Sequence, residues 1–279
     1  MTSAILVVGA SGNVGREVCA FLEVAGVAYL KTTRHHNQVA SDTRFLDFYA
    51  PESFAAAFKG IQTLFFVRPP AISQVERYIQ PFLATAGESG VEQVIFLSVI
   101  GVENLPFIPH AKIENLIIEM GFRYSFLRAS FFMQNFSSQH RAEIQQDNRI
   151  YIPAGKARVS FIDVQDIGAV AARLLRDFPA ENTQLDLTGP ESLNFQEIAK
   201  IFTEILGRRI DYVSPNWISF FLYRQQLGDA VAQILVMIML YTITRFGNAE
   251  TVSFEVEKIG DRAPRNFRDY VEQNQELWR

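Results

Sequence analysis

The chain has 279 residues, enough for one large α/β domain or for a core with a smaller lobe. Hydrophobic residues make up 48% of it and charged residues 20%, as in an ordinary soluble globular protein. The 26 basic and 30 acidic residues give a net charge of −4 with no basic block, so nucleic acid is not an expected partner.

The single cysteine, Cys19, excludes an internal disulfide and suits a reducing compartment. Met1-Thr2-Ser3 lacks the pattern of a signal peptide. The longest apolar stretch, residues 234–241, is shorter than the roughly 20 residues of a membrane span. We therefore expect a cytoplasmic protein with no membrane partner.

An apolar run at residues 4–8 predicts a strand that is buried on both faces, as in a parallel sheet. Three glycines follow at once and lead into a helical pattern, which is the order that a dinucleotide pyrophosphate needs. Gly9 permits the tight turn, Gly12 lets the backbone approach the phosphates, and Gly15 lets the helix pack close to the strand. This segment predicts cofactor contacts from Gly9, Ser11, Gly12, Asn13 and Val14.

Residues 27–34 predict the second strand, which ends in Thr33, Arg34 and His35 without a carboxylate. An acidic residue at this place holds the ribose hydroxyl of NAD, whereas a guanidinium offers paired donors to the 2′-phosphate of NADP. We therefore expect NADPH (NADP+) as the cofactor and count all three residues among its contacts. The alternative for Arg34 is a solvated loop charge.

A short strand-like step at residues 45–48 precedes a helix at residues 51–59. Asp47 in this step accepts from the adenine amino group, caps the helix, or does both. Phe48 is counted with Asp47 among the cofactor contacts.

Two more strands are predicted at residues 63–67 and 94–98, with a helix at residues 75–89 between them. This alternation predicts an α/β fold with a Rossmann-type, doubly wound parallel sheet, in which ligands bind at the carboxyl ends of the strands. At those ends we expect cofactor contacts from Val67, Arg68, Pro69 and Ser98, and a substrate contact from Pro70.

Further motifs lie along the rest of the chain: His110 and Glu114 one turn apart on a helix, Leu127-Arg128 followed by residues 131–135, residues 161–167, and the ending at residues 262–267. Together with the glycine turn, Arg34 and Pro69-Pro70, they resemble the NmrA-like group of atypical short-chain dehydrogenase/reductases. That group includes NADPH:quinone reductase-like and triphenylmethane reductase-like enzymes, and the resemblance extends over essentially the whole chain.

The resulting domain prediction has an NADP-binding Rossmann core and a smaller, mostly helical lobe that covers the substrate. The core comprises residues 1–130, with residues 157–189 returning to it. The lobe comprises residues 190–279 together with residues 131–156.

Ordinary short-chain dehydrogenases carry Tyr-x-x-x-Lys on the helix that here contains His110, and this sequence has no such motif. His110 donates a proton to a reduced carbonyl or imine nitrogen, contacts the nicotinamide ribose, or only interacts with Glu114. Ser98 matches the general place of the superfamily's catalytic serine, although a serine that closes a strand is commonly a turn former. His110 and Ser98 are the expected catalytic residues, His110 is also an expected cofactor contact, and no metal site is expected.

In the family, the segment after the strand at residues 124–127 lines the nicotinamide and substrate pocket. The resemblance therefore implies substrate contacts from Phe131, Phe132 and Asn135, with core packing as the alternative for the two phenylalanines. Asp163 and Asp166 are expected to cap the helix that follows them.

An aromatic stretch at residues 217–223 and an apolar helix around residues 234–241 are richer in apolar groups than a surface needs. They either wall a hydrophobic substrate pocket, to which Trp217 would belong, or form a homodimer face. Plain core packing is the third alternative and the first expectation for the helix.

The expected function is NADPH-dependent hydride transfer to a small, apolar molecule, namely a quinone, an enone, an imine or a triarylmethyl-type cation. Substrates that become aromatic or neutral on hydride addition need little acid catalysis, which fits the missing tyrosine. The alternative is a non-catalytic NADP(H)-sensing regulator that acts through a protein partner. The aromatic small lobe favours the enzyme, because a pure sensor has less need of it.

Overall fold

The computed structural model describes residues 5–247 and 249–279, and the chain divides into two compact units. The first unit comprises the chain up to Ala129 together with Val164–Leu187 and Glu255–Arg262. The second unit comprises Ser130–Asp163, Thr188–Phe254 and Ala263–Arg279.

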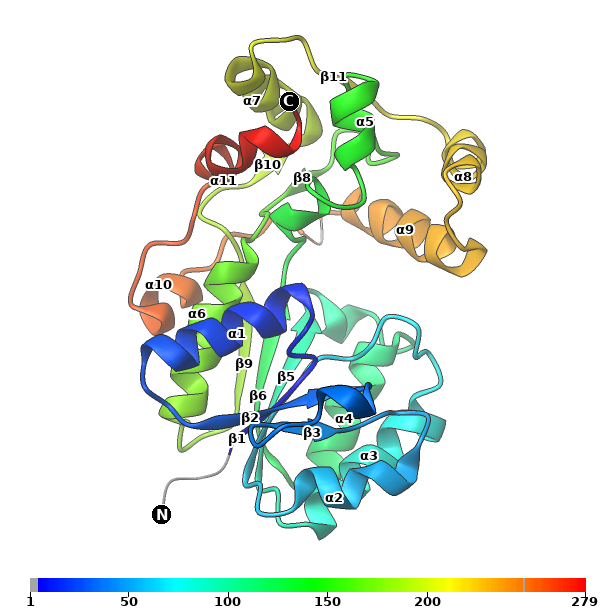
Figure 1. Ribbon diagram of the computed structural model, residues 1–279. Coiled ribbons are helices and arrows are strands. Elements are labelled where there is room, and N and C mark those ends of the chain that lie inside the picture. The colour runs from blue at the N-terminus through cyan, green and yellow to red at the C-terminus, as the bar shows by residue number, and fades with distance from the viewer. Residues whose placement is uncertain (1–4, 248) are drawn as a thin grey trace. The chain divides into compact units, whose positions relative to one another are not determined.

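The first unit is built on a seven-stranded parallel sheet with the order β3-β2-β1-β4-β5-β6-β9 (Figure 1). Its strands are β1 (Ile5–Val8), β2 (Tyr29–Thr33), β3 (Thr43–Phe45), β4 (Thr63–Phe66), β5 (Gln93–Val99), β6 (Arg123–Ala129) and β9 (Thr183–Leu187). The side chains of β1 and β4 are all buried, because helices cover both faces of the sheet. The prediction of a doubly wound parallel sheet is confirmed. Ala4, the first residue of the predicted strand, lies outside the described residues.

Helices α1 (Asn13–Val24), α6 (Val164–Arg176) and α10 (Glu255–Gly260) cover one face of this sheet (Figure 1). The other face carries α2 (Phe54–Phe58), α3 (Val75–Glu88) and α4 (Pro109–Glu119). Short 3₁₀ turns, η1 (His36–Gln38), η2 (Pro51–Ser53) and η3 (Val102–Asn104), follow β2, β3 and β5. A core cluster of this unit lies on the side of α2, α3 and α4 and is rich in phenylalanine, including Phe66, Phe82 and Phe96.

The second unit is mainly helical, with α5 (Arg141–Gln146), α7 (Phe195–Leu206), α8 (Trp217–Gln226), α9 (Val231–Thr244) and α11 (Phe267–Asn274) and the 3₁₀ turns η4 (Met133–Asn135) and η5 (Gln275–Leu277). Two small sheets complete it: β8 (Arg158–Val159) pairs antiparallel with β10 (Leu193–Asn194), and β7 (Arg149–Tyr151) pairs parallel with β11 (Asp211–Val213). Its core is aromatic, and includes the fully buried rings of Phe136, Phe195, Phe202 and Trp278.

The observed units differ from the predicted domains in two segments of several residues, and their boundaries also shift at Ser130 and at residues 188–189. Residues 157–163 belong to the second unit, because β8 pairs with β10 there and Phe161 packs among the aromatic rings of its core. Glu255–Arg262 belongs to the first unit, because α10 packs on α6, where Gly260 lies against Val170. Neither contact has a local signal in the sequence.

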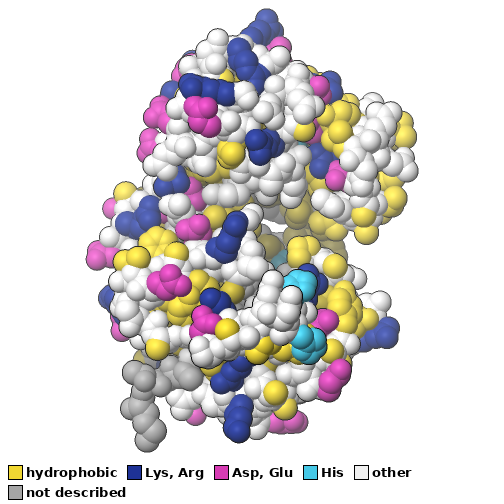
Figure 2. All heavy atoms as spheres, in the orientation of Figure 1, with side chains coloured by type: hydrophobic (Ala, Val, Ile, Leu, Met, Phe, Trp, Pro, Cys, Tyr) yellow, Lys and Arg dark blue, Asp and Glu magenta, His cyan; other side chains and the backbone are white. Residues whose placement is uncertain are grey.

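Helix α9 buries only one side. Ile234, Met237 and Tyr241 are buried, whereas Leu235 and Val236 have exposed fractions of 56% and 50%. Figure 2 shows hydrophobic side chains gathered over α8 and α9. This exposure excludes complete core packing of α9 and agrees with both functional alternatives. Among the described residues, every helix is too short or too polar to span a lipid bilayer.

Candidate functional site

The turn after β1 has the geometry of an anion site. Gly9 adopts a φ of +90°, which favours glycine, and its carbonyl accepts a hydrogen bond of 3.0 Å from the N–H of Gly12. Gly12 is the N-cap of α1 and supplies no side-chain cap. The N–H groups of the first helical turn, which begins at Asn13 and Val14, therefore stay available to a bound anion.

The same turn is too tightly packed to accept side chains. A Cβ atom on Gly15 would lie 2.1 Å from the carbonyl oxygen of Gly9, and one on Gly9 would lie 3.2 Å from the Cβ of Val67. The second contact joins the ends of β1 and β4, which are neighbours in the sheet although 58 residues separate them in the chain. The strand order reverses between these two strands, and such a switch point is where doubly wound sheets bind their ligands. This cradle fits a dinucleotide.

The end of β2 carries an exposed Arg34 beside an ordered turn. The hydroxyl of Thr33 donates a hydrogen bond of 2.8 Å to Gln38 and accepts one of 3.1 Å from the N–H of His35. The next imidazole, His36, stacks on Phe45 with ring centroids 3.7 Å apart. The backbone on either side of Arg34 is thereby fixed, and its guanidinium remains open to solvent and to a phosphate.

Asp47 and Phe48 follow β3. Asp47 accepts a hydrogen bond of 3.0 Å from the N–H of Tyr49, and its own N–H donates to the hydroxyl of Ser53 at 3.1 Å. Asp47 thus orders the turn before the helix but does not cap it, because the N-caps of η2 and α2 are Ala50 and Ser53 and neither start has a side-chain cap hydrogen bond. Phe48 is buried in the core against Phe54 and Phe82, so its ring is a packing element and only its backbone reaches the edge of the sheet.

The end of β4 continues into a loop that is held by its own arginine. One terminal nitrogen of Arg68 donates to the carbonyl oxygens of Pro69, Pro70 and Ile72, at 3.0, 3.1 and 2.7 Å. The Nε atom of Arg68 is buried without a hydrogen-bond partner. The Ser98 hydroxyl at the end of β5 is likewise buried without one. Two buried polar atoms without partners at the ligand-binding edge of the sheet are consistent with a bound group that would form hydrogen bonds with them.

His110 lies at the start of α4, partly buried against Phe96 of β5, with ring centroids 6.0 Å apart. Burial, assisted by the positive charge of Arg68, lowers the pKa of His110 to about 3. The imidazole is therefore neutral at physiological pH. A neutral imidazole still donates one hydrogen bond, but it does not carry the readily transferred proton of an imidazolium.

Glu114, the suggested partner of His110, is engaged elsewhere. Both of its carboxylate oxygens accept hydrogen bonds from Arg128 of β6, at 3.2 Å from Nε and 2.7 Å from the terminal nitrogen. Arg128 also contacts Glu103 at 3.3 Å. This largely buried, bidentate pair ties α4 to the sheet and frees His110 from Glu114. The interpretation of His110 as a simple helix-start partner of Glu114 is therefore wrong.

Apart from Pro70, which follows β4 in the first unit, the predicted substrate contacts lie in the second unit. Phe131 and Phe132 are half-buried, and Phe131 stacks on Tyr241 of α9 with ring centroids 6.2 Å apart. Phe132 pairs with Ile162, and its carbonyl accepts from the N–H of Asn135 at 3.1 Å. Trp217 begins α8 and exposes 50% of its surface. The structure thus leaves aromatic surface accessible at these positions.

Sequence reasoning missed a buried polar cluster in the same unit. All four members are nearly inaccessible to solvent: His140 at the N-cap of α5, Glu143 within α5, Arg224 of α8 and Tyr241 of α9. Glu143 accepts from Arg224 at 3.1 Å and contacts His140 Nδ1 at 3.0 Å, and His140 Nε2 lies 2.7 Å from the Tyr241 hydroxyl. These partners are up to 101 residues apart in the chain, so no local sequence pattern predicts their interactions.

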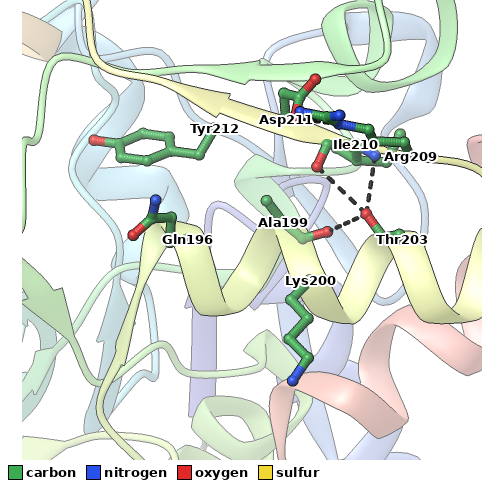
Figure 3. Close-up of a pocket in the computed structure, with 8 residues that line it drawn as sticks. All are labelled: Gln196, Ala199, Lys200, Thr203, Arg209, Ile210, Asp211 and Tyr212. Atoms are coloured by element: carbon green, nitrogen blue, oxygen red, sulfur yellow. Dashed lines mark hydrogen bonds and ion pairs between the residues drawn. The ribbon is translucent and has the colours of Figure 1, made fainter.

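Two open grooves of the second unit contain none of the predicted residues. The groove between α7 and β11, of about 310 Å³, is drawn in Figure 3. Its Thr203 hydroxyl donates to Ala199 and accepts from the N–H of Ile210, Arg209 pairs with Asp211, and Lys200 points away from β11 (Figure 3). The other groove, of about 470 Å³, lies between residues 155–158 and 244–250. We place no candidate site in either groove.

Comparisons with known proteins agree with this geometry. A family model described as the NmrA-like family matches residues 1–270. A protein of Bacillus subtilis described as the uncharacterized oxidoreductase YesF is 30% identical over 280 residues, which cover 98% of this chain and 96% of that protein.

Two solved structures share the fold. The triphenylmethane reductase of a Citrobacter species, complexed with NADP(H), superposes with a TM-score of 0.85 at 21% identity, over 97% of this chain and 99% of its own. The NADPH-dependent quinone oxidoreductase QOR2 of Escherichia coli, complexed with NADPH, superposes with a TM-score of 0.88 at 17% identity, over 97% of this chain and 99% of its own. At these identities the likeness shows the fold.

Proposed function

Because the chain belongs to the NmrA-like family, we propose that it is an NADPH-dependent reductase that transfers a hydride to a small, apolar electrophile. The observation that carries the proposal is the glycine turn at the switch point of the sheet. Its uncapped N–H groups lie at the same edge as the orphaned polar atoms of Ser98 and Arg68. The relationship to an oxidoreductase and the fold shared with two NADP(H)-bound reductases support it.

NADPH supplies the hydride when it is bound. The N–H groups of the first turn of α1 would hold its pyrophosphate, and Arg34 would hold its 2′-phosphate. Ser98 and His110 would orient the nicotinamide end, with the neutral His110 donating a hydrogen bond rather than a proton. The substrates proposed are quinones, enones, imines or triarylmethyl-type cations, of which quinones become aromatic and the cations become neutral on hydride addition and therefore need little acid catalysis.

The test is NADPH consumption by the purified protein against quinones, enones and iminium or triarylmethane dyes, with an NADPH binding titration beside it. Turnover with any member supports a reductase, and the rank order of the members outlines its substrate class. Tight NADPH binding without turnover across the panel would favour a cofactor sensor instead. Failure to bind NADPH would overturn the proposal.

The Arg34→Ala substitution tests the cofactor preference. Loss of a charge-assisted contact with the 2′-phosphate is expected to raise the Kd for NADPH about 10-fold or more, while the Kd for NADH, which lacks that phosphate, stays nearly unchanged. Isothermal titration with both cofactors measures the two constants. Arg176→Ala, at the end of α6 remote from the carboxyl ends of the strands, is the control. Equal losses for the two cofactors would remove the phosphate assignment.

The His110→Ala substitution tests His110, which is one of the two expected catalytic residues. Turnover is expected to fall about 10-fold or more, with little change in NADPH affinity. Because the pKa of His110 is lowered to about 3, the wild-type rate should not fall through a histidine titration as pH drops from about 8 to about 5. Steady-state rates over this pH range measure both effects, and Asn115→Ala, exposed one turn further along α4, is the control. Unchanged kinetics would reduce His110 to a structural residue.

A further inference from the structure

Three polar side chains converge at the carboxyl edge of the sheet in the first unit. Phe66 of β4 and Phe96 of β5 are partners in the parallel register, and their rings stack with centroids 5.1 Å apart. Ser98 lies two residues beyond Phe96 within β5 and so continues the same face of that strand, whereas Arg68 lies two residues beyond Phe66 in the loop after β4. His110 packs on Phe96 and therefore belongs to the same face.

Arg68 brings a positive charge to this edge that no acid neutralises. Its three hydrogen bonds run to backbone carbonyls, which carry no net charge. Within residues 5–247 and 249–279, no carboxylate lies within ion-pair distance of Arg68. By contrast, Arg128 on the next strand but one is neutralised by Glu114 and Glu103.

An uncompensated cation at a ligand-binding edge is costly in the free protein, because burial disfavours the charge. Burial does lower the pKa of Arg68, yet a guanidinium does not lose its proton in proteins. The charge of Arg68 also acts on His110, because Arg68 is the one charged group that lowers the pKa of His110. Arg68 therefore sets the electrostatic potential where the substrate would be reduced.

The charge of the acceptor changes in opposite directions for the two classes of substrate. In a neutral quinone the hydride, released by cleavage of a C–H bond of NADPH as the cofactor is oxidised to NADP+, forms a new bond to the acceptor, a π-electron pair moves onto oxygen, and the resulting hydroquinone anion takes a proton from water. In a triarylmethyl or iminium cation the hydride neutralises the positive charge and no proton is needed. A fixed cation stabilises the transition state of the first reaction and disfavours binding of the second acceptor.

We propose that Arg68 is the specificity-determining residue of the site, and that it directs the enzyme to neutral, quinone-type acceptors that become anions on reduction, in preference to cationic acceptors. This inference rests on the proposed reductase function. In this inference Arg68 interacts with the charge of the substrate, and it does not bind the phosphates of the cofactor.

Two substitutions separate the charge of Arg68 from its hydrogen bonds to the loop. Arg68→Met removes both, whereas Arg68→Lys keeps the charge but loses the planar fork that reaches several carbonyls. The ratio of kcat/KM for a neutral benzoquinone to kcat/KM for a cationic triarylmethane dye is measured at saturating NADPH. It is expected to fall about 10-fold or more in Arg68→Met and to stay within about threefold of wild type in Arg68→Lys.

The possible outcomes distinguish this inference from the proposed function. If both variants lose activity equally with both acceptors, Arg68 only holds its loop and the specificity role is overturned. A wild-type enzyme that prefers the dye also overturns it while leaving the reductase function intact. Absence of turnover with every acceptor in the wild type overturns both.

A second measurement does not depend on turnover. The imidazole signals of His110 are followed by NMR as pH is lowered, and His110→Ala assigns them. Removing the positive charge in Arg68→Met is expected to raise the pKa of His110, whereas Arg68→Lys is expected to leave it near the wild-type value. An unchanged pKa in Arg68→Met would show that the charge does not act at this edge and would overturn the inference. Circular dichroism of each variant confirms that it is folded.

Discussion

Replacing Gly15 with alanine is expected to abolish NADPH binding and to lower the free energy of unfolding by about 3 kcal/mol. The added Cβ would lie 2.1 Å from the Gly9 carbonyl oxygen and 2.8 Å from the Cα atom of Ala10. Both contacts are with backbone, which has no rotamer by which to move away. To accept the methyl group, α1 would have to withdraw from β1, and the N–H groups of its first turn would leave the phosphate position.

Denaturant unfolding and an NADPH titration measure the two effects of Gly15→Ala together. Gly87→Ala is the matched control, because Gly87 is an exposed helical glycine whose added Cβ would meet only a ring atom of Phe122, at 3.4 Å. The control is expected to keep its stability and its affinity. Wild-type stability and affinity in Gly15→Ala would show that the close approach of α1 to the turn is not required.

Replacing Glu143 with alanine is expected to have the largest effect in the second unit, a loss of about 3–5 kcal/mol in the free energy of unfolding. Glu143 and Arg224 expose 1% and 3% of their side chains, and the carboxylate also contacts His140. Its removal leaves the guanidinium buried with Asp229 as its remaining acidic partner, together with the carbonyl of Gln139. The cost is high because a buried charge loses its partner without regaining water.

The midpoint of urea unfolding measures the effect of Glu143→Ala. Glu76→Ala provides the comparison, since Glu76 pairs with Lys112 at 2.7 Å, closer than Glu143 to Arg224 at 3.1 Å, but on an exposed surface, and is expected to contribute about 1 kcal/mol or less. If the two substitutions had similar effects, the cluster around Glu143 would be dispensable for stability. Loss of α8 and α9 packing, rather than global unfolding, would show as exposure of Tyr241 to solvent.

Local sequence signals predicted the elements that position the cofactor. The apolar run at residues 4–8 and the three glycines that follow this run predict a buried strand, a tight turn and a helix start. The structure confirms all three features. The start of α7 is equally local, because Asn194 and Glu197 form a reciprocal capping box there. These features depend on residues within a few positions of one another, so the local sequence is enough to predict them.

Interactions between distant segments could not be predicted in this way. Asp163 was expected to cap a helix, but it also accepts from Arg265, 102 residues away, at 2.8 Å. Asp166 similarly faces Arg262 at 3.4 Å. The bidentate engagement of Glu114 by Arg128 left His110 without its expected neighbour. Such pairs depend on how elements pack, and a single sequence does not contain that information.

Arg68 is an intermediate case. A charged residue directly after a buried strand and before two prolines was visible in the sequence, and it was counted among the cofactor contacts. That its guanidinium turns back onto its own loop without an acidic partner was not visible. The roles of Arg34, Ser98 and His110 stay predictions, and the substitutions described above test those of Arg34 and His110.

The discontinuity of the first unit has a consequence for the synthesis of the protein. Strand β6 ends at Ala129, whereas its neighbour β9 begins only at Thr183 and α10, which packs on α6, ends at Gly260. A nascent chain therefore leaves the ribosome with the outer edge of β6 unpaired for on the order of several seconds at usual rates of translation. Such an edge is a template for pairing with another chain. We expect the yield of folded protein to rise when fewer nascent chains are present at one time, as under weak induction, more than it would for a protein whose sheet is completed in order.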